Sequence, residues 1–232
     1  MNRKVTAIFA AVILSFTAVQ LYAVPIDKIF TSSGQILDGE EWSNVYIYND
    51  DTIVDMLGGD VDGIGTYDAS TVNVTGGHVN TFDALEFSTA NISGGYVYSL
   101  RAGDSATASI FDGGFVSSLT ATGNLGTVSV YGGIVDYVCP GESGLVNLYG
   151  GLITDSLSAL DQSVVNVFGY DLIKTNYGGI YGHGQVYGFW SDGTSFTIDL
   201  NGLETYSHIN LIPEPSSLIL LFTGVLILRR IR

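Results

Sequence analysis

Carboxylates are the chemical groups that this sequence offers most freely. Four of them lie close enough in the chain to meet in neighbouring turns of a repetitive fold: Asp60, Asp62, Asp83 and Glu86. Two carboxylates that converge across a cleft are what glycosidic-bond hydrolysis requires. A polysaccharide lyase would instead need a basic residue, and only Arg101 and Lys174 are available, far apart in the sequence. A carbohydrate-active enzyme is therefore the alternative interpretation, not the leading one.

Other reactive groups are sparse. The three histidines stand apart from one another and outside any zinc-binding helix motif: His78, His183 and His208. Cys139 is the only cysteine, which excludes an intrachain disulfide and a cysteine-based metal site. Residues 60–63 (Asp-Val-Asp-Gly) echo part of an EF-hand loop, but Gly58 and Ala69 occupy two of its ligand positions. We expect a protein that is not an enzyme and has no cofactor or specific metal site, although so acidic a surface would bind divalent cations loosely.

The charge distribution argues against nucleic acid as a partner. The formal net charge is −15, and between Val24 and Ile212 the basic residues are only Lys28, Arg101 and Lys174, against 22 of the 23 Asp and Glu residues. Such a body repels phosphate backbones. The other five basic residues lie at the two ends of the chain, which is typical of targeting segments.

The body of the chain is a repeat marked by pairs of glycines. The pairs recur every 18 or 19 residues: Gly58-Gly59, Gly76-Gly77, Gly94-Gly95, Gly113-Gly114, Gly132-Gly133 and Gly150-Gly151, with a degenerate seventh at Gly169-Tyr170. Self-similarity at a short fixed period is the signature of a solenoid. The period is too short for a crossover helix between parallel strands.

Apolar residues occupy fixed columns relative to the first glycine of each pair. Two residues before it stand Met56, Val74, Ile92, Phe111, Val130, Leu148 and Val167; three after it stand Val61, Val79, Val97, Val116, Val135, Ile153 and Leu172. A further column, six after, holds Ile64, Phe82, Leu100, Leu119 and Val138 and fails at Ser156. Alternation of apolar and polar residues before the glycines predicts short strands with one buried face. Glycine then turns the chain, because it reaches backbone angles closed to other residues.

These patterns predict an all-β fold, a single-chain right-handed parallel β-helix (β-solenoid) of about seven coils over residues 51–176. Residues 24–50 are expected to cap one end and residues 177–212 the other, the latter with a β-hairpin around Asp192-Gly193. The column three before the first glycine holds Asp55, Asn73, Asn91, Ile110, Ser129, Asn147 and Asn166. We expect its amides to hydrogen-bond from coil to coil, in preference to forming a binding strip.

Aromatic residues gather beside the glycine turns. They lie one before or two after the first glycine and are expected to face outward: Tyr96, Phe115, Tyr131, Tyr149 and Phe168. Aromatics on a flat β-face could hold sugar rings or a partner protein. The alternative is that a loop or the C-terminal cap covers them.

Residues 1–23 match a secretory signal peptide. Arg3 and Lys4 form its positive start, residues 5–19 are almost wholly apolar, and Ala23 offers a small residue before the cleavage site. The alternative is an uncleaved N-terminal anchor. Export of the body is therefore expected.

The last twenty residues combine three features in order. Pro213-Glu214-Pro215 is a rigid, extended triplet, residues 216–228 are uncharged and apolar, and the chain ends with Arg229, Arg230 and Arg232. Thirteen residues would form a helix of about 20 Å, shorter than the ~30 Å hydrocarbon core of a bilayer. Marginal insertion is expected if the arginine side chains extend to the membrane surface. The arginines would stay in the cytoplasm.

This arrangement resembles the PEP-CTERM sorting signal. The resemblance implies that an exosortase, a membrane enzyme, recognises Pro213, Glu214 and Pro215, and that Arg229, Arg230 and Arg232 act as the stop-transfer signal. It also implies transient anchoring by the helix 216–228, followed by release to the cell surface or the exopolysaccharide matrix. We therefore expect a non-catalytic structural or adhesive surface protein, with exopolysaccharide as a candidate partner.

Overall fold

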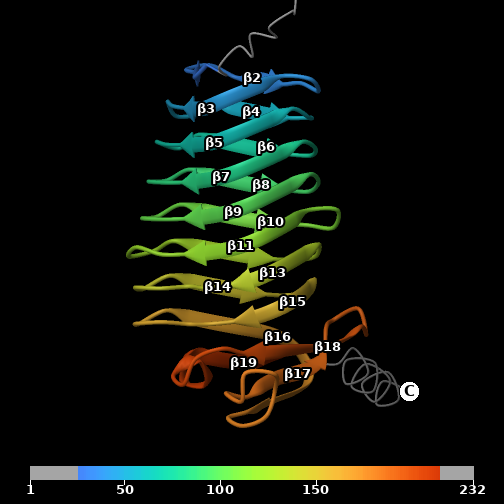
Figure 1. Ribbon diagram of the computed structural model, residues 1–232. Helices are drawn as coiled ribbons and strands as arrows, with labels where there is room; N and C mark the ends of the chain where they lie inside the picture. Colours follow the sequence, from blue (N-terminus) through green and yellow to red (C-terminus); the bar gives the residue numbers. More distant parts are fainter. Residues whose placement is uncertain (1–25, 215–232) are drawn as a thin grey trace, which may run out of the picture.

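The computed structural model describes residues 26–214, and these form a β-solenoid of about seven turns (Figure 1). The strands belong to two faces that alternate along the chain. One face is built from β1 (Lys28–Phe30), β3 (Glu41–Ile47), β5 (Asp60–Thr66), β7 (His78–Ala84), β9 (Tyr96–Ala102), β11 (Phe115–Ala121), β13 (Ile134–Val138) and β15 (Leu152–Leu157). The other is built from β2 (Gly34–Ile36), β4 (Ile53–Met56), β6 (Thr71–Val74), β8 (Thr89–Ile92), β10 (Thr107–Ile110), β12 (Thr127–Val130), β14 (Leu145–Leu148), β16 (Val164–Thr175) and β19 (Ile209–Pro213).

Successive coils stack in parallel register, as the glycine period predicts. Val74 pairs with Ile92, and Val130 pairs with Leu148, which in turn pairs with Val167. All five side chains are fully buried. The inward columns therefore lie above one another along a common axis. Stacking buries the apolar side chains that a single coil would leave exposed to solvent.

The fourth coil departs by one residue from the register drawn from the glycine pairs. Ile110, not Phe111, pairs with Ile92 and Val130 and is fully buried, whereas Phe111 faces solvent. The turn between β10 and β11 (111–114) is one residue longer than the turns at 93–95 and 131–133, and the additional residue precedes the glycine pair. The apolar alternation decides the register, because a one-residue slip would turn the whole strand inside out.

A similar shift occurs in β15. The column six residues after the first glycine does not end at Val138, because Leu157 pairs with Val138 and is fully buried, one place beyond Ser156. The register between β13 and β15 shifts after Val135 to allow this. The core column is thus continuous where the fixed count from glycine predicts a gap.

Polar ladders run along the outside of the second face. Asn91 Nδ2 donates to Asn73 Oδ1 (3.0 Å), and Asn73 Nδ2 donates to Asp55 Oδ1 (2.8 Å). A second ladder links Asn210 to Asn166 (3.1 Å) and Asn166 to Asn147 (2.9 Å). The predicted amide ladder is therefore present, and each rung ties one coil to the next.

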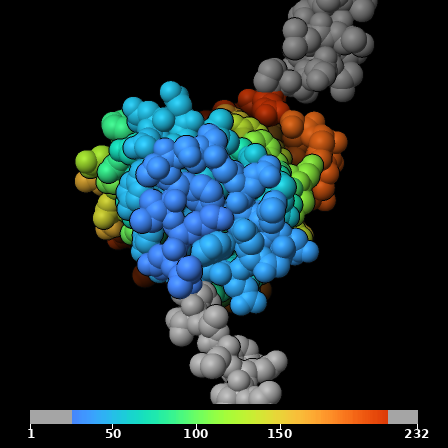
Figure 2. Space-filling view, turned by 90° about the horizontal axis from the view of Figure 1, so that it is seen from above, coloured from blue at the N-terminus to red at the C-terminus, as the bar shows by residue number. Residues whose placement is uncertain are grey.

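Both ends of the described chain carry further strands. In the N-terminal segment, β1 and β2 pair in parallel with β3 and β4, so the stacking already begins there. At the other end, β17 (Gln185–Phe189) and β18 (Ser195–Leu200) form an antiparallel hairpin that joins β15 and β16. The 3₁₀ turn η1 (Thr205–His208) leads into β19, which pairs with β16. Seen along the axis, the C-terminal segments (orange and red) project to one side (Figure 2).

Candidate functional site

Aromatic rings form a continuous column just before the glycine turns. Phe111, Tyr131, Tyr149 and Phe168 stack face to face, with ring centroids 5.4, 5.0 and 4.2 Å apart and planes within 19° of parallel. Each follows directly after a buried core residue, so strand alternation turns it outward. Tyr131 is 50% exposed. The column therefore presents ring edges and tyrosine hydroxyls to solvent, one coil after another.

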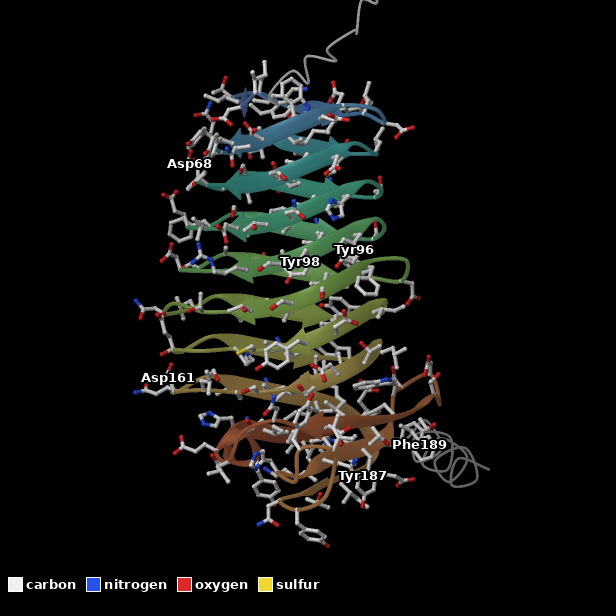
Figure 3. All side chains as sticks on the ribbon, in the orientation of Figure 1. Asp68, Tyr96, Tyr98, Asp161, Tyr187 and Phe189 are labelled. Atoms are coloured by element: carbon white, nitrogen blue, oxygen red, sulfur yellow. The ribbon has the colours of Figure 1, made fainter. Side chains whose placement is uncertain are left out.

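A second column lies just after the same turns, on the other face. His78, Tyr96 and Phe115 stack with centroids 5.2 and 5.0 Å apart, and the exposed Ile134 and Leu152 continue the line. We call the two columns together the aromatic edge: Phe111, Tyr131, Tyr149 and Phe168, with His78, Tyr96 and Phe115. Figure 3 shows Tyr96 on this side of the solenoid.

All five aromatics singled out from the sequence lie on the aromatic edge, and each is at least partly exposed. Two members were missed. The count from the glycines predicts Phe111 in the core because it is one residue out at this coil, and the sequence presents His78 as an isolated histidine. His78 is also held by Asp60, whose carboxylate oxygen lies 3.1 Å from Nδ1. His78 lies two residues after the first glycine of its pair, as Tyr96 and Phe115 do, and this shared offset is the sequence signal that indicates its place in the column.

The opposite edge of the solenoid is acidic. Its turns place Asp68, Glu86, Asp104, Glu142 and Asp161 at φ between +51° and +58°. Several of these carboxylates accept a hydrogen bond from a backbone N–H of the preceding coil, as Asp68 does from Asn49 (2.7 Å) and Glu142 from Gly123 (2.7 Å). Figure 3 shows Asp68 and Asp161 on the side away from Tyr96. This acidic edge favours neutral or cationic partners over polyanions.

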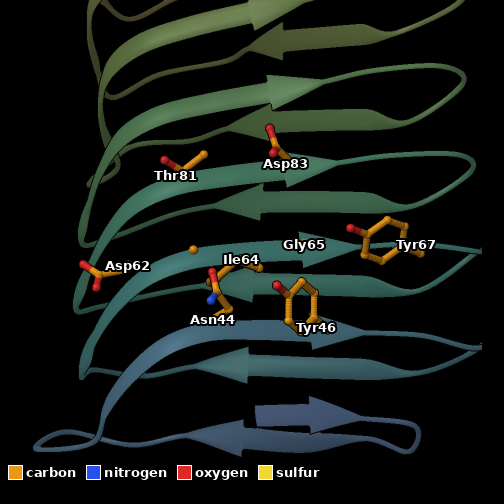
Figure 4. Close-up of a pocket in the computed structure, with 9 residues that line it drawn as sticks. Asn44, Tyr46, Asp62, Ile64, Gly65, Tyr67, Thr81 and Asp83 are labelled. Atoms are coloured by element: carbon orange, nitrogen blue, oxygen red, sulfur yellow. The ribbon is translucent and has the colours of Figure 1, made fainter. Parts of the chain in front are cut away.

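The four carboxylates considered for catalysis are only partly brought together. Asp62 and Asp83 line one shallow hollow, whereas Asp60 pairs with His78 and Glu86 belongs to the acidic edge. The hollow has a volume of about 350 Å³ and lies over Gly63 and Gly65 of β5 (Figure 4). We call it the glycine hollow. Asp62 accepts a hydrogen bond from Asn80 (2.8 Å), and Asp83 pairs with Arg101 (2.8 Å).

A second groove, of about 420 Å³, lies between the β17–β18 hairpin and the glycine turns. Trp190 lies beneath it but is only 3% exposed, its ring stacks on Phe196 at 3.7 Å, and its Nε1 donates to the carbonyl oxygen of Gly151 (3.1 Å). Trp190 therefore holds the hairpin against the solenoid. Its ring offers no free face to a ligand.

Metal-ligand clusters and membrane-spanning helices concern residues 26–214, the part of the chain that the structure describes. Within that range no three His, Cys, Asp or Glu side chains converge as metal ligands would, and no helix has the length and apolar character needed to cross a bilayer. Cys139 is a free thiol. The predicted signal peptide with Ala23, the helix 216–228 and Arg229, Arg230 and Arg232 all lie outside the described residues.

The predicted sorting triplet begins where the solenoid ends. Pro213 is the last residue of β19 and pairs with Gly169, whose carbonyl oxygen also accepts a hydrogen bond from the Glu214 backbone N–H (2.7 Å). Pro215 lies outside the described residues. The chain therefore passes from the last coil directly into the triplet.

The fold defines the class of protein: a β-solenoid with an aromatic edge and an acidic edge. Comparisons with protein-family models, with curated proteins and with solved structures returned no match.

Proposed function

We propose that the protein is a non-catalytic structural or adhesive component of the cell surface or exopolysaccharide matrix. The observation that carries this proposal is the aromatic edge, whose two columns stack rings from His78 to Phe115 and from Phe111 to Phe168. Its ring edges are apolar and its phenol groups are polar, a combination suited to a sugar chain with apolar C–H groups and hydroxyls. A neutral polysaccharide carries no charge that the acidic body would repel. Nucleic acid is not expected to bind, because its phosphates would be repelled.

The route to the surface is also part of the proposal. The signal peptide 1–23 would direct export with cleavage after Ala23, and an exosortase would recognise Pro213, Glu214 and Pro215. Until processing, the helix 216–228 would hold the protein in the membrane, with Arg229, Arg230 and Arg232 in the cytoplasm. These steps, the terminal helices and the right hand of the solenoid stay predictions from the sequence.

The adhesive role is tested by removing rings from the aromatic edge. The double variant Tyr131→Ala with Tyr149→Ala is expected to lose most of its retention on the cell's own exopolysaccharide. Tyr98→Ala is the matched control, because Tyr98 is 57% exposed and lies outside both columns. Thermal unfolding of each variant separates lost binding from lost folding. Equal retention of the double variant and the wild type would reject the aromatic edge as the adhesive surface.

A carbohydrate-active enzyme remains the second candidate, favoured by one observation: Asp62 and Asp83, from neighbouring coils, line the same hollow. Release of reducing sugars or unsaturated products from exopolysaccharide would support it. That release would have to disappear in the Asp62→Asn, Asp83→Asn variant. The leading proposal expects no such release from the wild type.

A further inference from the structure

The glycine hollow arises because one coil lacks side chains that its neighbours carry. Gly63 of β5 pairs with Asn44 and Thr81, and Gly65 pairs with Tyr46 and Asp83. The neighbouring residues form the walls of a depression one coil wide, whose floor is the β5 backbone (Figure 4). Glycine inside a strand weakens it and often marks close approach of a ligand or another chain.

Stacking of the coils does not require these two glycines. The closest atom to a Cβ on Gly63 would be the Asn44 side-chain oxygen, at 2.7 Å, with the Ser43 carbonyl oxygen at an ordinary 3.8 Å; a Cβ on Gly65 would meet the Tyr67 ring, at 3.0 Å. Both close contacts are with side chains that can move. At the turn glycine Gly77, by contrast, a Cβ would strike the backbone of the preceding coil at 2.6 Å. The turn glycines serve the fold, whereas Gly63 and Gly65 line the hollow and let the Asn44 and Tyr67 side chains lie close to the β5 backbone.

Polar groups around this space are held in place before any ligand arrives. Asp62 is fixed by Asn80, Asp83 by Arg101 (both 2.8 Å), and Asn44 donates to Asp27 (2.9 Å). A carboxylate can accept about four hydrogen bonds, so each aspartate keeps acceptor capacity for ligand hydroxyls. Preorganised groups reduce the entropy lost on binding.

Tyrosine rings complete the rim. Tyr67 lies over Gly65 and stacks on Tyr48, with centroids 5.0 Å apart, and Tyr46 lines the hollow from β3, on the same side as Asn44. Burial raises the pKa of the Tyr67 hydroxyl, with the nearby tyrosines and acids adding to the effect. The group therefore stays a neutral donor at physiological pH. The hollow thus combines carboxylates, an amide, phenols and an aromatic surface.

We propose that the glycine hollow binds one residue of a neutral polysaccharide, with Asp62 and Asp83 accepting hydrogen bonds from its hydroxyls. The volume of about 350 Å³ is at the low end for ligand sites, which suits a single sugar ring. The charge of Asp62, unpaired among the described residues, and the acidic body disfavour anionic sugars. The inference rests on the proposed function, because it assumes that polysaccharide is the partner, and it adds a binding site separate from the aromatic edge.

The test fills the hollow without disturbing the fold. Gly63→Ser introduces the residue type that β9 and β11 carry at this position, Ser99 and Ser118. The probe is a set of neutral oligosaccharides cut from the cell's own exopolysaccharide, titrated by calorimetry against the full protein. We expect at least about a tenfold loss of affinity, with an unfolding midpoint equal to or above that of the wild type. Asp62→Asn with Asp83→Asn should show a comparable loss, and Ser118→Gly should leave the affinity unchanged.

The outcomes separate this inference from the proposed function. If the wild type binds and Gly63→Ser binds equally well, the hollow is not a sugar site, although the adhesive proposal stands. If the wild type does not bind the oligosaccharides at all, both are overturned. Loss of affinity in Gly63→Ser together with normal affinity in Tyr131→Ala, Tyr149→Ala would support the hollow and reject the aromatic edge.

Discussion

Substituting a turn glycine tests whether the coils depend on direct backbone contact. Gly77 has φ +85°, and an added Cβ would lie 2.6 Å from the Gly59 carbonyl oxygen and 2.7 Å from the Gly58 carbonyl carbon. Gly178 also has φ +85°, yet nothing lies within 4 Å of its Cβ position. The pair of variants Gly77→Ala and Gly178→Ala therefore shares the backbone strain and differs only in the collision.

The expected magnitudes follow from these two terms. Left-handed backbone costs alanine about 1–2 kcal/mol relative to glycine, which sets the loss for Gly178→Ala. Gly77→Ala adds a collision with backbone atoms that cannot move without opening the stack, worth about 1–3 kcal/mol or more. We expect total losses of about 1–2 kcal/mol for Gly178→Ala and about 2–5 kcal/mol for Gly77→Ala.

Equilibrium denaturation in urea, followed by circular dichroism, measures both free energies of unfolding. The difference between the variants is the informative quantity, because strain and unfolded-state effects cancel in it. If Gly77→Ala cost no more than Gly178→Ala, the close stacking of the glycine turns would be wrong.

Three further predictions concern the core, pH and the acidic edge. Phe82→Ala should lower the free energy of unfolding by about 3–5 kcal/mol, because Phe82 is fully buried between Ile64 and Leu100. The hydrogen bond from the Leu37 backbone N–H lowers the pKa of Glu40 below its usual 4.5. The stability that ionised Glu40 contributes is therefore present above about pH 4.5 and is lost as pH falls through the folded-state pKa. Glu40→Gln should flatten the dependence of melting temperature on pH below about pH 4.5. Glu142→Ala should cost about 1–2 kcal/mol in denaturant unfolding, since it removes the acceptor of the Gly123 backbone N–H.

Each of these has an internal control. Phe87→Ala, at an exposed phenylalanine, should change stability by less than about 0.5 kcal/mol. Melting temperatures of the wild type and Glu40→Gln that differ by the same amount below about pH 4.5 as above about pH 6 would contradict the Glu40 assignment. Glu142→Gly should cost less than Glu142→Ala, because glycine relieves the backbone strain, and the reverse order would show that φ at this turn is not a source of strain.

The sequence was sufficient to predict the stack of coils, because each coil contacts only its two neighbours along one axis. Every coil repeats the same inward positions, so Val74, Val130 and Leu148 could be aligned without knowing any distance. The amide ladder through Asn73 and Asn91 followed from the same alignment.

The fourth coil shows where counting from glycine fails. The count placed Phe111 in the core, although Ile110 continues the alternation of apolar residues set by Ala108. Burial of the strand face outweighs the position of the turn, so the additional residue is absorbed in the turn between Ile110 and the glycine pair. The hydrophobic alternation was the better guide, and its use would have extended the aromatic column by one ring.

The two polar features of the surface were missed for different reasons. The acidic edge has a readable period, since Asp68, Glu86, Asp104 and Glu142 each follow the first glycine by ten residues. The glycine hollow depends instead on what the neighbouring coils place above and below Gly63. That arrangement requires the three-dimensional register.

Distances between spin labels test the central claim, a regular stack of coils, most directly. In a Cys139→Ser background, a label at Ile53 is paired with a label at Thr127, Leu145 or Val164, which occupy the same column in successive coils. Because parallel strands lie about 4.8 Å apart, the backbone separations should be ~19, ~24 and ~29 Å. Double electron–electron resonance should therefore give three distances that rise by about 5 Å per coil. Distances that do not rise in equal steps from Thr127 to Val164 would contradict the solenoid.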